Sequence, residues 1–358
     1  MTFDLSNVTP SITLPTPVDA AHDLPADLHY TSDEVDGYTL TRGSDGFTLI
    51  DAEGRAVEGA EVVDRVRELV VPPQWNDVWV CADPRGHVQC TGRDGRGRKQ
   101  YIYHPEYSAY RQRSKFAKLT AFAEKLPSLR AEVDRQLRRR TWDRERMLAL
   151  TVRLLDRAHL RIGSARYEAE NATYGLTTLR RRHVQSADDA RGPLRLCFSG
   201  KSGKYRQVTI KNRQLARLVR EVAALPGYRL FHYSDENGRP ADLDSGDVNE
   251  YLHRHMGERF SAKDFRTWGG TSYAVKFYPA ALEAQNADGA RGKLTTKLVK
   301  LVAAELGNTV TVCREYYIHP DVLSAAEAGA LPSEPWSDQE DATALTPYEL
   351  ATLELIAG

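Results

Sequence analysis

The chain has 358 residues, which is enough for two domains and a sizeable core. Its 49 Lys and Arg residues balance its 49 Asp and Glu residues, so the formal net charge is zero. No apolar run approaches the ~18–20 residues of a membrane span, no signal peptide is evident, and the four cysteines form no CxxC pair. We therefore expect a soluble, cytoplasmic protein with no membrane partner, no zinc site and no disulfide framework.

The charges are unevenly distributed along the chain. Residues 1–41 contain seven acids and residues 321–358 contain eight, and neither segment has a Lys or Arg. All 49 basic residues therefore lie in 42–320, against the remaining 34 acids, a surplus of 15. A basic body between acidic ends is typical of a protein that binds a polyanion, although a chance distribution over a solvated surface is the alternative. Residues 1–28 and 323–358 are also rich in Pro, Ala, Ser and Thr, which predicts acidic, flexible tails.

Residues 29–105 predict a small antiparallel β-sheet domain. Short segments of alternating apolar and polar residues are separated by Gly-, Asp- and Pro-containing turns, the pattern of β-hairpins. Strands are expected at 38–43, 44–51, 78–83 and 86–92, and a short helix at 62–69.

A Gly- and Arg-rich turn spans residues 92–101 of this domain. Glycines let the backbone approach a ligand closely, and guanidinium groups suit phosphates. Tyr101 and Tyr103 alternate onto one face, where they could stack on nucleic-acid bases. An exposed flexible hairpin is the alternative, but further basic residues up to Lys118 favour binding. The predicted nucleic-acid contacts here are Arg93, Arg96, Arg98, Lys99, Tyr101 and Tyr103.

The pattern is mainly helical from residue 106 to residue 322. Apolar residues recur at helical spacing in 114–125, 127–138, 143–159, 212–225, 245–257 and 263–276. One β-hairpin insertion, 194–210, interrupts the helices, with Gly-Lys-Ser-Gly at its tip. The predicted fold class is therefore α+β: a small N-terminal antiparallel sheet domain and a larger, mainly α-helical domain with a β-hairpin insertion.

Residues 297–320 combine a helix end with a pair of tyrosines. A helix over 297–306 should be capped by Gly307, since glycine accepts the left-handed conformation that closes a helix. A second helix should begin near Thr311 and stop before Pro320. Asn308 then lies at the junction, little more than two turns from the phenols of Tyr316 and Tyr317. Alone, such a tyrosine pair is more often core packing or a hydroxyl anchor.

Three cations elsewhere in the chain also fall at helix ends or loop tips. Arg161 follows a long predicted helix, Lys201 is at the hairpin tip, and Arg266 is near the start of another helix. Taken singly, each is more often a surface or turn residue. Together with Asn308 and a tyrosine they could converge on one anion.

These residues lie in an ordered set of motifs that resembles a known family. The set is similar to the catalytic domain of type IB DNA topoisomerases, specifically the compact bacterial and poxvirus-like group. The segment 72–104 resembles the N-terminal domain of that group, and the resemblance covers about residues 38–320. The catalytic-domain motifs are RIG (161–163), FSGKSGK (198–204), DFRTWGG (264–270) and LGNTxxxCRxYY (306–317).

The resemblance implies a role for each residue. Arg161 and Arg266 would bind the non-bridging oxygens of the scissile phosphate, and Lys201 would protonate the 5′-oxygen leaving group. Tyr317 matches the nucleophile. Asn308 stands where many members have histidine, so hydrogen bonding to a phosphate oxygen is expected there in place of imidazole acid–base chemistry.

The resemblance also implies an activity and a partner. The chain would relax supercoiled duplex DNA through a 3′-phosphotyrosine intermediate, strand rotation and religation, without ATP, metal or cofactor. It would act as a nucleoid-associated monomer that clamps double-stranded DNA between its two domains, with Lys204 among its DNA contacts. Sequence alone leaves two alternatives, a tyrosine recombinase-like strand transferase and a non-catalytic basic DNA-binding protein.

The chemistry independently requires these residue types. A phenol with a pKa near ~10 is mostly protonated at neutral pH, so the site must favour its anion. Negative charge develops on the phosphoryl oxygens during the attack, and guanidinium and amide donors stabilise it there. No Asp and Glu cluster with metal-ligand spacing accompanies these residues, which argues against a two-metal nuclease.

Overall fold

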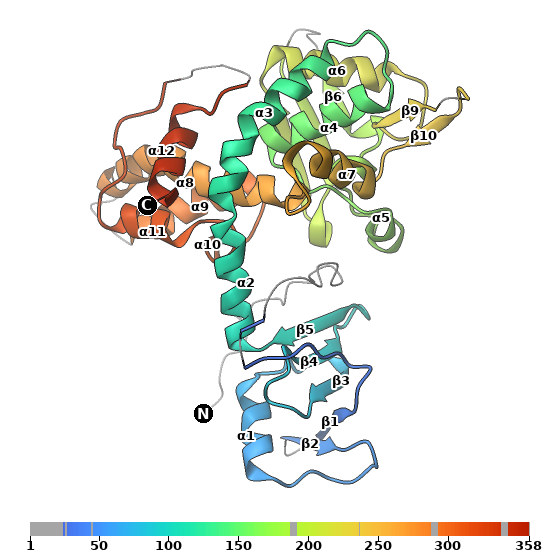
Figure 1. Ribbon diagram of the computed structural model, residues 1–358, viewed down its shortest axis with the longest axis vertical. Helices are drawn as coiled ribbons and strands as arrows, with labels where there is room; N and C mark the ends of the chain where they lie inside the picture. Colours follow the sequence, from blue (N-terminus) through green and yellow to red (C-terminus); the bar gives the residue numbers. More distant parts are fainter. Residues whose placement is uncertain are drawn as a thin grey trace. The chain divides into compact units, whose positions relative to one another are not determined.

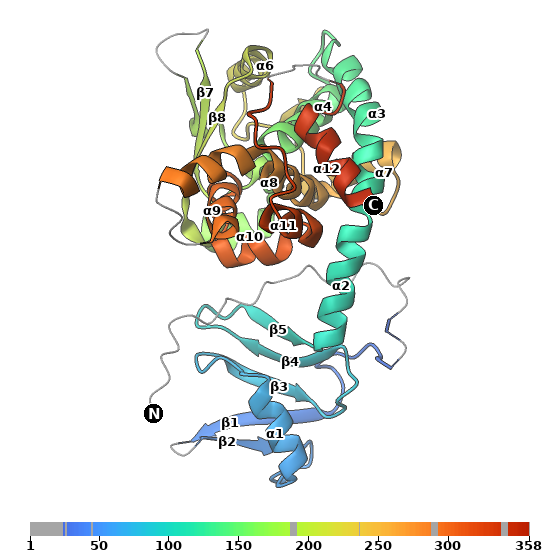
Figure 2. The same ribbon diagram turned by 90° about the vertical axis from the view of Figure 1, so that its left-hand side faces the viewer.

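The computed structural model describes residues 24–25, 27–43, 46–186, 192–235, 237–287, 293–337 and 343–357. Most of the predicted N-terminal tail lies outside these described residues. The chain divides into two compact units, one ending at Ala117 and one beginning at Lys118 (Figures 1 and 2). The boundary lies beyond the expected one near residue 105, because helix α2 (Pro105–Ala117) belongs to the first unit.

The first unit is built on a five-stranded antiparallel sheet with the strand order β2-β1-β3-β4-β5 (Figure 2). Helix α1 (Ala60–Glu68) packs Val66 against Leu40, Leu49, Val78 and Val80 on one face of this sheet. The sheet confirms the predicted β-rich character of the region. The strands are β1 (Gly37–Gly43), β2 (Gly46–Ile50), β3 (Asn76–Cys81), β4 (Val88–Arg93) and β5 (Lys99–Tyr103).

The second unit is mainly helical and is arranged around the long helix α8. This helix contacts α3, α4, α7, α9, α11 and α12, and its Trp268 and Phe265 are fully buried. The helices are α3 (Leu119–Leu137), α4 (Arg144–Ala158), α5 (Ala165–Asn171), α6 (Arg213–Ala224), α7 (Ser245–Met256), α8 (Ala262–Ala287), α9 (Leu294–Leu306), α10 (Val310–Tyr316), α11 (Pro320–Glu327) and α12 (Pro347–Ala357).

Two small sheets complete the second unit. Strands β6 (Val184–Ser186), β7 (Leu194–Ser199) and β8 (Tyr205–Ile210) pair in that order, so the predicted hairpin insertion is confirmed and extended by one strand. Strands β9 (His232–Ser234) and β10 (Pro240–Asp242) form a separate hairpin. The fold class is therefore α+β, as expected. Of the helices described, none combines the length and apolar character needed to cross a membrane.

The break between α2 and α3 lies at Lys118, and not at Pro127 where the sequence predicted a new helix. Pro127 is inside α3. An interior proline removes a hydrogen bond and costs about 3 kcal/mol. The buried side chains of Phe122, Leu126 and Leu129 on either side of it each stabilise the continuous helix by about 1.5–3 kcal/mol, which offsets that cost.

The acidic C-terminal segment differs from the expected tail. Helix α12 contacts α3 and α8, and its Glu349 is only 4% exposed. The Glu349 carboxylate accepts hydrogen bonds from Arg130 at 2.7 and 3.0 Å and from Trp268 Nε1 at 3.1 Å. Composition did not reveal this, because an acid that pairs with a buried arginine is indistinguishable in the sequence from one that faces solvent.

Candidate active site

Asn308 lies at the junction of α9 and α10, as the sequence predicted, whereas Tyr317 lies one residue beyond the helix that was expected to carry it. Gly307 caps α9 in the left-handed conformation, with φ of 62°, which is inexpensive only for glycine. The Thr309 side chain caps the start of α10 by accepting from the Val312 N–H at 3.3 Å. Helix α10 ends at Tyr316, so Tyr317 is the residue at its C-terminal cap.

Arg266 and Arg161 converge on the side chain of Asn308. The Asn308 Oδ1 atom accepts from Arg266 Nη2 at 3.0 Å and also from Arg161 Nη2. Arg266 is only 4% exposed, and it also donates to the carbonyl oxygens of Leu306 at 3.0 Å and of His159. Its guanidinium carbon lies 5.3 Å from the centre of the Tyr317 ring. Four of the five predicted catalytic residues therefore meet at one point.

The paired glycines of the DFRTWGG motif allow this close packing. A methyl group on Gly270 would overlap the carbonyl of Tyr317 and lie 2.9 Å from its Cβ. A methyl group on Gly269 would lie 2.6 Å from the ring of His159, whose carbonyl holds Arg266. Glycine is thus required at both positions by the close approach of α8 to Tyr317 and to the end of α4.

The two neighbouring tyrosines differ in their electrostatic surroundings. Burial alone would raise the pKa of Tyr317, but the positive charges of Arg266, Arg161 and Lys263 outweigh it and lower the pKa below its usual value of 10. Burial raises the pKa of Tyr316 to about 12. A phenol that ionises more easily is the better nucleophile at neutral pH, and this contrast favours Tyr317 over Tyr316.

Lys201 lies in the tight turn Lys201–Gly203 at the tip of the β7–β8 hairpin, and its side chain is exposed. It lines a small pocket together with Arg161 and Arg266, so the structure brings it to the same site. Lys204 follows in the same turn and is also exposed. The full lining of the pocket is Leu160, Arg161, Tyr174, Gly175, Phe198, Gly200, Lys201, Arg206, Arg266 and Leu306.

Two donor groups in the site have no hydrogen-bond partner among the described residues. They are Nε of Arg266 and Nδ2 of Asn308, and both atoms are buried. Buried donors are almost always satisfied. The oxygens of a bound phosphate are acceptors of the type that these two groups lack, so the arrangement fits a phosphate ligand.

Sequence reasoning missed two residues of this site. His159 ends α4 in the left-handed conformation, and its carbonyl accepts from Arg266. Arg206 lines the pocket from strand β8. The sequence does carry a signal for Arg206, because it alternates onto the same face of the strand as the apolar residues Val208 and Ile210. In the structure these three residues are less exposed than the residues between them. The histidine had no such signal, because its contribution is a backbone carbonyl.

The predicted DNA contacts of the first unit lie along strands β4 and β5. The Asp94 carboxylate organises their turn by accepting from the backbone N–H groups of Arg96 and Arg98 at 3.0 Å. Arg98 also forms an ion pair with Asp94 at 2.6 Å, and Lys99 forms one with Asp33 at 2.7 Å.

The remaining residues of that set are Arg93, which is exposed at the end of β4, and the two tyrosines of β5. The rings of Tyr101 and Tyr103 stack on each other with centroids 5.9 Å apart. All six residues share one hairpin, while their contact with DNA stays a prediction.

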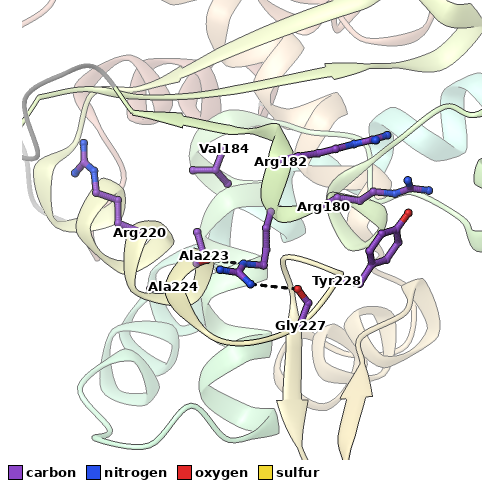
Figure 3. Close-up of a pocket in the computed structure, with 9 residues that line it drawn as sticks. Arg180, Arg182, Val184, Arg220, Ala223, Ala224, Gly227 and Tyr228 are labelled. Atoms are coloured by element: carbon purple, nitrogen blue, oxygen red, sulfur yellow. Dashed lines mark hydrogen bonds between the residues drawn. The ribbon is translucent and has the colours of Figure 1, made fainter.

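A second pocket, of about 690 Å³, is lined by arginines elsewhere in the second unit. Arg181 is held there by the carbonyl of Ala223 at 2.7 Å. In Figure 3 the guanidinium groups of Arg220 and Arg182 point to opposite sides of this pocket. These arginines therefore lack the convergence on one point that Arg161 and Arg266 have. The lining is Arg180, Arg181, Arg182, Val184, Arg220, Ala223, Ala224, Gly227 and Tyr228.

Comparison with protein families gives two matches in the chain. Residues 104–329 match the family described as eukaryotic DNA topoisomerase I, catalytic core. Residues 46–94 match the bacterial DNA topoisomerase IB, N-terminal domain. The first match includes all five predicted catalytic residues.

Individual proteins are similar over large parts of the chain. The DNA topoisomerase 1B of Acanthamoeba polyphaga mimivirus is 31% identical over 265 residues, which cover 72% of this chain and 77% of that protein. Two structures of a XerH site-specific recombinase bound to difH substrate are 18% and 16% identical, with TM-scores of 0.32 and 0.33. They cover 54% and 58% of this chain, and the chain spans 47% and 52% of theirs. From its family matches and its viral relative, the chain belongs to the type IB DNA topoisomerase family, whose members are isomerases.

Proposed function

We propose that the protein relaxes supercoiled duplex DNA by cutting one strand transiently through Tyr317 and resealing it after strand rotation. The observation that carries this proposal is the convergence of two guanidinium groups and one carboxamide beside a single phenol, with the Asn308 amide held by both arginines. Membership of the family supports it. As the family resemblance implies, the proposed reaction requires no ATP, metal or cofactor.

In the proposed reaction the Tyr317 oxygen forms a bond to the phosphorus while the bond from phosphorus to the 5′ oxygen breaks. The phenolic proton is lost to solvent, and the 5′ oxygen takes a proton from Lys201 at the hairpin tip. The 3′ phosphate stays covalently linked to Tyr317, so the energy of the phosphodiester bond is kept and resealing is the reverse of cleavage.

The arginines act where charge develops. Arg161 and Arg266 are the proposed partners of the two non-bridging oxygens, and Nδ2 of Asn308 donates to one of them. These donors are already held by protein contacts before a phosphate arrives, so they need little reorganisation during the reaction. Removing one preorganised donor of this type typically costs ~3–4 kcal/mol of transition-state stabilisation.

Binding to DNA is proposed to depend mainly on phosphate contacts from the basic body of the chain, including Lys204 and the hairpin residues of the first unit. Such contacts carry little sequence information, and the affinity should fall steeply with salt. The proposed partner is double-stranded DNA of the nucleoid, clamped by a monomer that uses both units.

The direct test is relaxation of an arbitrary supercoiled plasmid in EDTA and without ATP. The proposal predicts a ladder of relaxed topoisomers under these conditions. A strand transferase would instead require a specific recognition site. A non-catalytic DNA-binding protein would retard the plasmid and leave its linking number unchanged, and this result would overturn the proposal.

A further inference from the structure

Arg206 enters the active-site pocket from a different element than the other cations. It lies on β8 opposite Phe198 of β7 and is half-buried. Its Nη2 group donates to the carbonyl of Glu305 at 3.0 Å. A methyl group on Gly307 would overlap the Arg206 guanidinium. The guanidinium therefore rests on the backbone of the residue that directly precedes Asn308.

The pocket around Arg206 has an unbalanced charge. Four of its lining residues are cations, Arg161, Lys201, Arg206 and Arg266, and none of the lining residues is an acid. Burial and the charge of Arg266 lower the pKa of Arg206, and the negative charge of Glu305, which does not line the pocket, only partly opposes them. Burial, together with the charges of Arg266 and Arg206, lowers the pKa of Arg161. Cations that repel each other in a partly dry pocket are unfavourable until an anion joins them.

Asn308 cannot relieve this imbalance. Its Oδ1 atom is already shared by Arg161 and Arg266, and as a neutral amide it brings only its Nδ2 donors to an anion. Among the described residues, no carboxylate forms an ion pair with Arg206, and the Glu305 group that it contacts is a backbone carbonyl. The Glu305 carbonyl uses one of the five N–H donors of the guanidinium, and the residue lines the pocket, so further donors are available to an anion that binds there.

We propose that Arg206 is a third phosphate-binding arginine of this pocket, and that it contacts a non-bridging oxygen of the scissile phosphate. This inference rests on the proposed function and adds to it a residue from the hairpin that carries Lys201. Two functions are thereby joined in one hairpin: proton donation from its tip and charge stabilisation from its second strand.

The test compares Arg206→Ala and Arg206→Gln with a matched control, Arg195→Ala. Arg195 is exposed on the neighbouring strand β7, so its loss removes the same charge from the same sheet. Arg206→Gln is included in case Arg206→Ala unfolds, because glutamine retains a donor for the Glu305 carbonyl. Single-turnover rates of adduct formation are measured on two duplexes, one with the normal phosphate at the cleavage site and one with a methylphosphonate. The methylphosphonate replaces one charged non-bridging oxygen by a neutral methyl group.

The Arg206 variants should form the adduct about 100-fold or more slowly on the normal phosphate. The two methylphosphonate stereoisomers are assayed separately. On the isomer that lacks the oxygen contacted by Arg206, the defect should shrink at least about tenfold, because the atom that the arginine stabilises has been replaced by a methyl group. Arg195→Ala should match the unaltered protein on every substrate. An equal defect of the Arg206 variants on the normal phosphate and on both stereoisomers, or a defect that appears only as weaker DNA binding, would overturn the inference. Failure of the unaltered protein to form any adduct would refute the proposed function instead.

Discussion

Two clusters of arginine in the second unit use the same side chain in opposite ways. Arg130 is buried between two acids, at 2.8 Å from Asp156 and 2.7 Å from Glu349. Arg161 and Arg266 are instead held by an amide oxygen and by backbone carbonyls, with no acid lining their pocket. The charge of Arg130 is compensated within the fold, whereas the charges of Arg161 and Arg266 are available to an anionic ligand.

The compensated cluster also supports the uncompensated one. Asp156 is on α4, just before the His159 carbonyl that holds Arg266. Trp268, which donates to Glu349, lies on α8 two residues after Arg266. The same two helices therefore run from the neutralised ion cluster to the pocket, and substitutions in either cluster should have different consequences.

The largest effect on stability is expected from Arg130→Ala. It leaves the buried Glu349 carboxylate without its cation and leaves Asp156 only its pair with Arg157 at 3.3 Å. Breaking a buried ion cluster in this way typically costs ~3–5 kcal/mol of the free energy of unfolding. Chemical denaturation measures this loss directly. The control is Arg217→Ala, whose exposed pair with Glu221 contributes only ~0.3–0.5 kcal/mol. Similar losses for the two variants would contradict the assignment of Arg130 to a buried structural cluster.

Arg161→Ala should give the opposite pattern. Adduct formation should slow by about two to three decades, or ~3–4 kcal/mol. The free energy of unfolding should stay the same or rise, because the substitution relieves repulsion from Arg266 and Arg206. Single-turnover cleavage and denaturation on the same preparation measure both quantities. A loss of stability like that of Arg130→Ala would show that the two clusters do not differ as described.

Gly270→Ala tests the packing that positions Tyr317. Its added methyl group overlaps a backbone carbonyl that cannot rotate away, so α8 and Tyr317 must shift, at a cost of ~1–3 kcal/mol. Because the shift is at the nucleophile, cleavage should slow while DNA affinity is kept. Gly43→Ala is the control, since a methyl group there meets no atom within 4 Å. Cleavage at the unaltered rate by Gly270→Ala would contradict the close approach.

The smallest effect is a shift in pH dependence. The pKa of Tyr317 is lowered by Arg266, Arg161 and Lys263. The cleavage rate should therefore rise with pH and level off below the usual tyrosine pKa of ~10. Arg161→Ala removes one of these charges, so the rise should move to higher pH. A substrate with a 5′-bridging sulfur removes the need for a proton donor, so that the profile reports the nucleophile alone. An unchanged or lower midpoint in Arg161→Ala would contradict the electrostatic account of Tyr317.

The contrast also explains what the sequence could and could not predict. The strands, the hairpin insertion and the Gly307 cap were predictable, because the alternation of apolar residues, the turn residues and the helix-capping glycine each determine the structure of their own short segment. Arg161, Arg266 and Asn308 were found through motifs that bring distant stretches together. Glu349 was assigned to a tail, since its partner Arg130 is 219 residues away and nothing local marks the pair. The His159 carbonyl was missed for a related reason, because a backbone atom leaves no trace in residue type.

Cleavage by the proposed mechanism requires Tyr317 as the nucleophile. The direct measurement is the covalent protein–DNA adduct on a suicide duplex for Tyr317→Phe, Tyr316→Phe and the unaltered protein, with DNA affinity measured in parallel. Tyr317→Phe should bind DNA as tightly as the unaltered protein and form no adduct, while Tyr316→Phe should still form it. An adduct formed by Tyr317→Phe would contradict the account.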